Sequence, residues 1–172
     1  MSPRVVLSAY HCTKRSGETQ PCDHSDEQRL AVLGRNFIDM RKVQEYTTIP
    51  IIKVLVPKHG GLIHGKKYTH DFALLVLKYP AKLIPAIGPI CLPEPKAEFR
   101  GEKAIAAGWG RTHGPSISRR QSPVLKKVVL TVSYKRYRHY KMLGTRVSQK
   151  DNLYQDPCSG DSGSMRIQKI LV

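Results

Sequence analysis

The sequence predicts an all-β fold, and two observations carry that prediction. Apolar runs of strand length recur along the chain, each partly β-branched and bounded by glycine, proline or charged residues. A proline- and charge-rich segment, residues 92–103, divides the chain near its middle. Proline lacks the N–H that a strand ladder needs, so this segment is expected to be a surface crossover between two antiparallel β portions.

The expected strands follow one another in both portions. The first portion has apolar runs at residues 5–7, 30–33, 49–56 and 71–77, and the second at residues 104–107 and 128–132. Residues 134–143 are the exception. Tyr134, Tyr137 and Tyr140 recur there at intervals of three, which is a helical spacing, so one or two helical turns are expected.

The charge balance is strongly basic. The 29 Lys and Arg residues against 13 Asp and Glu residues give a formal net charge of +16. Such an excess favours an anionic partner, or it is simply the basic surface of a secreted protein. No apolar run approaches about 18 residues, so no transmembrane helix is expected. The apolar stretch after Arg4 is too short for a signal peptide.

The four cysteines favour disulfides over a metal site. Three full pairings are open, and the sequence does not choose among them. No Cys-x-x-Cys pair occurs, and the long spacings do not resemble a zinc cluster. Neither a metal nor a cofactor is expected. The cysteines are Cys12, Cys22, Cys91 and Cys158.

A candidate nucleophile stands in the segment Cys-Ser-Gly-Asp-Ser-Gly at residues 158–163. A serine hydroxyl is a poor nucleophile unless a base removes its proton. His11, which follows an apolar run, and Asp71, which opens another, are the candidate base and its orienting carboxylate. The order His11, Asp71, Ser162 is that of the triad found in chymotrypsin-like enzymes.

Five segments in order resemble the successive blocks of a trypsin-like serine protease. The resemblance implies a chymotrypsin-like double antiparallel β-barrel, here incomplete. Residues 1–172 would be a single partial peptidase domain, with the first-barrel portion at 1–91, the crossover at 92–103 and the second-barrel portion at 104–172. The five segments are Ser-Ala-Tyr-His-Cys (8–12), His-Asp-Phe-Ala-Leu-Leu (70–75), Pro-Ile-Cys-Leu-Pro (89–93), Ala-Ala-Gly-Trp-Gly (106–110) and Cys-Ser-Gly-Asp-Ser-Gly (158–163).

The resemblance also implies roles for individual residues in a secreted endopeptidase. Ser162 would attack the peptide carbonyl, His11 would take its proton, and Asp71 would orient the imidazole. The N–H groups of Gly160 and Ser162 would form the oxyanion hole. Asp156, six residues before Ser162, would select Arg or Lys at the cleavage site.

The chain also departs from the family pattern. The activation sequence, Arg or Lys followed by Ile-Val-Gly-Gly, is absent, and the chain ends ten residues after Ser162. Pro157 replaces a small residue, and Tyr10 replaces an alanine. These departures predict a domain truncated at both ends and inactive as given.

Two other readings stay open. One is a non-catalytic protease remnant or pseudo-protease. The other is a basic polyanion-binding module, for which residues 133–141 provide cations interleaved with aromatic rings. A heparin-like polyanion fits this segment better than a nucleic acid, since the segment matches no RNA-binding motif.

Overall fold

The structure, a computed structural model, describes residues 2–14, 29–39, 41, 47–58, 61–63, 67–111, 121–137, 140–146, 162 and 166–168. These residues form ten strands and one short 3-10 helix, and the described part contains no α-helix. The all-β prediction is therefore confirmed. Across the same residues, no helix has the length and apolar character needed to cross a membrane.

The chain divides into two compact units, Met1–Leu92 and Pro93–Val172. The segment before the first strand of the second unit is irregular and largely exposed, and that strand begins at Lys103. The assignment of residues 1–91 and 104–172 to the two barrels of one peptidase domain stays a prediction.

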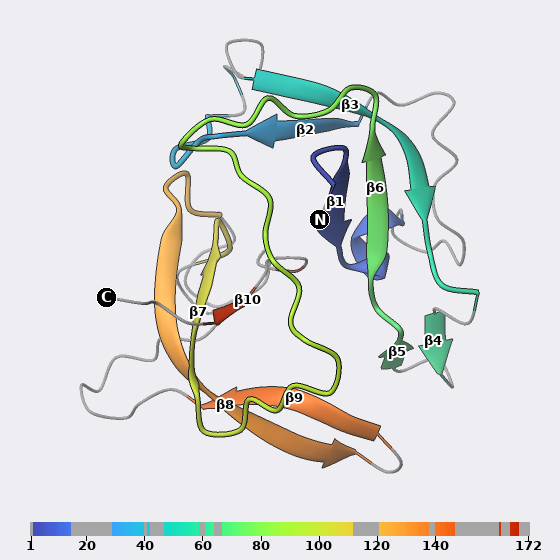
Figure 1. Cartoon of the computed structure of the whole chain (residues 1–172), viewed down its shortest axis with the longest axis vertical. Coiled ribbons are helices and arrows are strands. Elements are labelled where there is room, and N and C mark those ends of the chain that lie inside the picture. The colour runs from blue at the N-terminus through green and yellow to red at the C-terminus, as the bar shows by residue number, and fades with distance from the viewer. Residues whose placement is uncertain are drawn as a thin grey trace. The chain divides into compact units, whose positions relative to one another are not determined.

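The first unit contains a four-stranded antiparallel sheet with β6 at its interior (Figure 1). β6 pairs with β1 on one side and with β3 on the other. The sheet order is β1-β6-β3-β2, with β1 at Val5–Ser8, β6 at Ala73–Leu77, β3 at Thr47–Leu55 and β2 at Leu30–Leu33.

β3 changes partner part-way along its length, and this curls the sheet. Residues 47–50 pair with β2, and residues 51–55 pair with β6. The register shifts between Ile51 and Lys53, and an irregularity of this kind bends a strand and increases its twist. The bend in β3 is visible in Figure 1.

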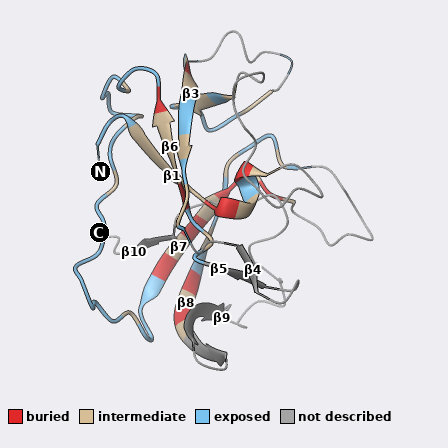
Figure 2. Ribbon diagram, turned by 90° about the vertical axis from the view of Figure 1, so that its right-hand side faces the viewer, coloured by how far each residue is buried: buried red, intermediate tan, exposed pale blue. Residues whose placement is uncertain are grey.

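The second unit also has a four-stranded sheet in which one long strand, β8, changes partner along its length. The sheet order is β10-β7-β8-β9, with β7 at Lys103–Gly108, β8 at Lys126–Tyr137, β9 at Tyr140–Arg146 and β10 at Arg166–Gln168. β8 pairs with β7 over residues 126–131 and with β9 over residues 131–137. Every second residue of β7 is buried, namely Ala104, Ala106 and Gly108 (Figure 2). This alternation is that of a strand with one face on a core.

The expectation of helical turns at residues 134–143 is wrong. Residues 134–137 belong to β8 and residues 140–143 to β9, with Tyr134 the partner of Leu143 and Tyr137 the partner of Tyr140. A short polar helix must meet the cost of its own nucleation. Tyrosine favours strands, and the apolar run at residues 128–132 already forms one, so pairing with β9 prevails. The three-residue spacing has no meaning in a strand, whose period is two.

A further small hairpin was not anticipated from the sequence. β4 (Gly61–Ile63) pairs with β5 (Lys67–Thr69) as a separate two-stranded sheet in the first unit. Its strands are only three residues long, which is too short for an alternating pattern to be recognised.

Candidate functional site

The pairing of β1 with β6 brings His11 and Asp71, the two predicted site residues of the first unit, close together. The strands are antiparallel, and Ser8 is the partner of Ala73. The residues that follow β1 therefore lie at the same end of the sheet as the residues that precede β6. His11 comes three residues after Ser8, in the short 3-10 helix η1 (Tyr10–Thr13), and Asp71 comes two residues before Ala73.

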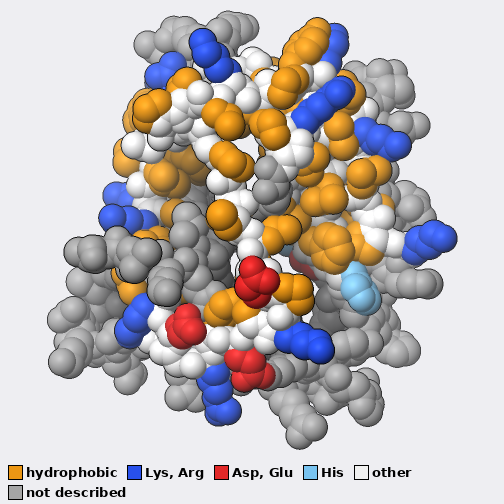
Figure 3. Space-filling model, viewed as in Figure 1, with side chains coloured by type: hydrophobic (Ala, Val, Ile, Leu, Met, Phe, Trp, Pro, Cys, Tyr) orange, Lys and Arg blue, Asp and Glu red, His pale blue; other side chains and the backbone are white. Residues whose placement is uncertain are grey.

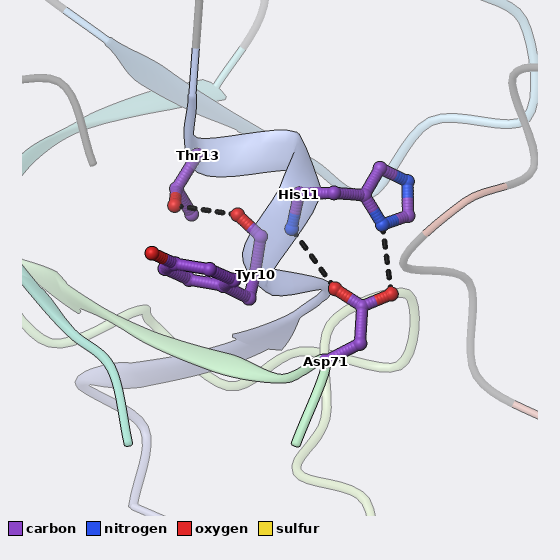
Figure 4. A network of polar contacts seen from close by, with 4 residues as sticks. All are labelled: Tyr10, His11, Thr13 and Asp71. Atoms are coloured by element: carbon purple, nitrogen blue, oxygen red, sulfur yellow. Dashed lines mark hydrogen bonds and ion pairs between the residues drawn. The ribbon is translucent and has the colours of Figure 1, made fainter. Parts of the chain in front are cut away.

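One carboxylate holds His11 at two points (Figure 4). The main-chain N–H of His11 donates to Oδ1 of Asp71 at 2.9 Å. Nδ1 of the imidazole lies 2.8 Å from Oδ2 of the same residue. The side chains are 32% and 30% exposed, so the pair is partly screened from water and still reachable.

This arrangement selects the chemistry of the imidazole. An ionised carboxylate only accepts hydrogen bonds, so it favours the tautomer that carries the proton on Nδ1. Nε2 is then the nitrogen with an available lone pair. A histidine held in this way has the orientation and tautomer that a general base acting through Nε2 needs.

A tight turn places the Asp71 side chain. His70 has a positive φ of 51°, and the N–H of Phe72 donates to the carbonyl of His70 at 2.8 Å. Residues other than glycine adopt this backbone region uncommonly, although histidine is among the more tolerant. The turn directs the chain into β6 immediately after the carboxylate.

The Cys12 thiol is influenced by the same carboxylate. Cys12 is exposed by surface area, yet the protein atoms that partly surround its thiol raise its pKa above the ordinary value of 9.0, and the negative charge of Asp71 raises it further. Both causes favour the neutral thiol. Cys12 and Cys91, the two described cysteines, both carry thiols, while Cys22 and Cys158 lie outside the described residues.

The remaining predicted site residues belong to the second unit. Ser162 is described and is exposed in a turn, while Asp156 and Gly160 lie outside the described residues. The structure thus brings together His11 and Asp71. The complete triad, the oxyanion hole and the specificity residue stay predictions. Within the described ranges, no group of three or more His, Cys, Asp or Glu residues is arranged to hold a metal ion.

Sequence reasoning missed the support beneath His11. The hydroxyl of Thr13, a residue only 1% exposed, donates to the carbonyl of Tyr10 at 2.7 Å. Tyr10 itself is 4% exposed. The only sign of this support in the sequence was that Tyr10 stands where the family has alanine. Nothing in the sequence pointed to Thr13.

The family model described as Trypsin matches residues 1–168 of the chain. The chain belongs to the trypsin family. The resemblance drawn from the five sequence blocks is therefore confirmed, and a serine peptidase is supported at the level of the family.

Two relatives show how this trypsin-family chain compares with longer proteins. It is 28% identical to Serine protease 7 of Drosophila melanogaster over 176 residues, which cover 93% of this chain and 43% of that protein. It is 33% identical over 106 residues to the Inactive CLIP domain-containing serine protease A28 of Anopheles gambiae, covering 55% of this chain and 27% of that one. The chain thus spans less than half the length of these curated relatives.

A solved structure supports the fold. Neuropsin, a serine protease expressed in the limbic system of mouse brain, aligns with a TM-score of 0.72 at 20% identity, covering 98% of this chain and 69% of that chain. At this level of identity the likeness concerns the fold alone. It agrees with the predicted chymotrypsin-like architecture.

Proposed function

We propose that the protein is a serine endopeptidase that uses His11, Asp71 and Ser162 as its catalytic triad. The observation that carries the proposal is the double hold of Asp71 on His11, at the main-chain N–H and at Nδ1. This hold leaves Nε2 as the basic nitrogen, which is what a hydroxyl nucleophile requires. Membership of the trypsin family supports the same reading.

In the proposed reaction, Oγ of Ser162 attacks the scissile carbonyl while Nε2 of His11 takes its proton. The N–H groups of Gly160 and Ser162 stabilise the oxyanion of the tetrahedral intermediate. The imidazolium then gives the proton to the leaving amine, and an acyl-enzyme remains. A water molecule, deprotonated by His11, hydrolyses the acyl-enzyme and restores the serine.

The proposed substrates are proteins or peptides with Arg or Lys before the scissile bond. Asp156 would supply the carboxylate that pairs with the cationic side chain. An extracellular location is part of the same proposal and follows from the family resemblance.

The test uses the chain as printed and the protein that its full transcript encodes, each treated with an activating protease. Under the proposal, a fluorophosphonate probe labels Ser162 in at least one of the two forms, and that form cleaves Arg and Lys peptides. Ser162→Ala should abolish labelling and lower kcat by several orders of magnitude. Cleavage after Phe or Leu but not after Arg would contradict the role of Asp156. Absence of labelling in both forms would favour a non-catalytic protein, as the name of the Anopheles relative states for that protein.

A second candidate function, a polyanion-binding surface, is favoured by the β8–β9 hairpin. Residues 126–146 contain no acidic residue. Arg136 and Lys141 are cross-strand partners, and like charges placed opposite each other are unfavourable unless an anion neutralises them. The basic residues of the segment are Lys126, Lys127, Lys135, Arg136, Arg138, His139, Lys141 and Arg146.

Matched double variants test this surface against simple loss of charge. Arg136→Ala with Lys141→Ala should lower the salt concentration at which the protein elutes from immobilised heparin. Lys58→Ala with Lys82→Ala removes the same charge from exposed positions of the first unit and should have a smaller effect. Equal shifts for the two double variants would mean that heparin responds only to net charge.

A further inference from the structure

The helix that carries His11 is too short to stabilise itself. η1 is a single 3-10 turn, entered from an extended residue, Ala9, and left through another, Lys14, with φ −107° and ψ 154°. Hydrogen bonds in such turns have poor geometry, and one turn does not recover the cost of nucleation. Contacts outside the backbone ladder must therefore fix its position.

Two buried side chains of the turn supply these contacts. The Tyr10 and Thr13 residues are 4% and 1% exposed, whereas the neighbouring His11 side chain is 32% exposed. Figure 4 shows the rings of Tyr10 and His11 pointing away from each other. Nζ of Lys14 lies 4.1 Å from the centroid of the Tyr10 ring, within the range of a cation–π contact.

The hydrogen bonds converge on one peptide group. The carbonyl of Tyr10 and the N–H of His11 belong to the same planar unit. Thr13 Oγ1 donates to this carbonyl at 2.7 Å, and Asp71 Oδ1 accepts from this N–H at 2.9 Å. The two bonds hold opposite ends of the peptide group, so together they oppose its rotation.

The orientation of this peptide group matters because Asp71 also binds the imidazole. Its two carboxylate oxygens lie in one plane, and Oδ2 is 2.8 Å from Nδ1 of His11. A rotation of the peptide group about its Cα–Cα axis would turn the His11 N–H away from Oδ1, so Asp71 would lose one of the two contacts that fix its carboxylate against His11. The hydroxyl of Thr13 thus acts on the imidazole through the main chain.

We propose that Thr13 and the Lys14-covered ring of Tyr10 are positioning residues for His11. They fix the peptide group between residues 10 and 11, and thereby keep the imidazole aligned with Asp71. The consequence for catalysis rests on the proposed function, while the alignment of the His11–Asp71 pair does not.

The decisive variant is Thr13→Val, which removes the hydroxyl and keeps the shape of the side chain. The solvent exchange of the His11 Nδ1 proton is followed by NMR in ¹⁵N-histidine-labelled protein, with His11→Gln identifying the resonance. We expect this exchange to become about tenfold faster, because the Nδ1 contact is no longer held. Fluorophosphonate labelling of Ser162 should slow by about tenfold to 10²-fold, the range that follows from a small misplacement of a catalytic group.

Two further variants separate positioning from mere stability. Thr13→Ser keeps the hydroxyl and should restore proton exchange and labelling to within about twofold of wild type. Thr48→Val makes the same chemical change in β3, away from the turn, and should leave both measurements unchanged. The proposal would be overturned if the Nδ1 proton of Thr13→Val exchanged at the wild-type rate, or if Thr48→Val changed the rate as much as Thr13→Val does.

Two remaining outcomes are also decisive. If Thr13→Val does not fold, the same measurement is made on Lys14→Gln, which removes the cation–π contact with Tyr10. An exchange rate about threefold higher than that of the wild type would then support the proposal, and an unchanged rate would overturn it. If the wild-type protein is not labelled at all, the proposed function fails, and proton exchange alone decides the positioning role.

Discussion

Asp71 interacts with three groups at once: the main chain of His11, the imidazole of His11 and the thiol of Cys12. The negative charge of Asp71 disfavours a thiolate nearby and so raises the pKa of Cys12. Burial adds to this effect and is the larger cause of the raised Cys12 pKa. A single side chain therefore orients the imidazole of His11 and makes the adjacent cysteine a weaker nucleophile.

The pH dependence of Cys12 alkylation tests this interaction. Iodoacetamide reacts with the thiolate, so in the folded protein its rate should rise at a higher pH than the ordinary value of 9.0 implies. Asp71→Asn should lower the midpoint in part, and unfolding in urea should lower it further, because unfolding also removes burial. A midpoint unchanged by Asp71→Asn would contradict the electrostatic part of the explanation.

The same shift has a consequence for stability. The folded state holds the thiol proton more tightly than the unfolded state, so between the two pKa values it binds more protons. The contribution of Cys12 to the free energy of unfolding is complete below the unfolded pKa. It is lost as the pH rises through the raised folded pKa.

His70 offers a second prediction at this scale. Its φ of 51° costs little for histidine or asparagine and much more for a β-branched side chain. We expect His70→Val to lower the free energy of unfolding by about 1–2 kcal/mol, and His70→Asn to change it by less than about 0.5 kcal/mol. Urea denaturation measures both. Equal stabilities would show that the turn relaxes without cost.

At the scale of elements, β6 connects the site to the core of the first unit. Asp71 lies just before β6, which is paired on both sides and contains the fully buried Ala73 and Leu77. Leu77→Ala should lower the free energy of unfolding by about 2–5 kcal/mol. Leu55→Ala, in β3 and 42% exposed, should cost less than about 1 kcal/mol. Similar losses in the free energy of unfolding for the two variants would show that Leu77 is not part of the core.

The strands that the sequence predicted well are those with a continuous apolar run. β2 occupies residues 30–33 as expected, and β7 extends the expected run by one residue at each end. The strand at residues 128–132 was expected, but its continuation to Tyr137 and its pairing with β9 were not, because the polar residues there show no alternating pattern and pairing with β9 decides their conformation. Similarly, the motifs identified His11 and Asp71, but the Thr13 hydrogen bond depends on the path of the chain through η1.

At the scale of the whole molecule, the formal net charge of +16 is the dominant property. Figure 3 shows several exposed Lys and Arg side chains among the described residues. Apolar side chains are also exposed, among them Leu92 at 63% and Tyr79 at 58%. A large net charge of one sign in general favours polyanions as partners, but charge alone gives no specificity.

Salt dependence therefore separates a polyanion site from a generally basic surface. Each anionic group that the protein neutralises releases counterions, so the affinity of a multivalent site falls steeply as salt rises. If the hairpin provides a site, heparin affinity should fall by at least about 10²-fold between roughly 50 and 200 mM salt. The Arg136→Ala, Lys141→Ala double variant should show a shallower slope, because it makes fewer contacts, and the Lys58→Ala, Lys82→Ala variant should keep the wild-type slope. Parallel slopes for all three proteins would show that heparin does not bind through the hairpin.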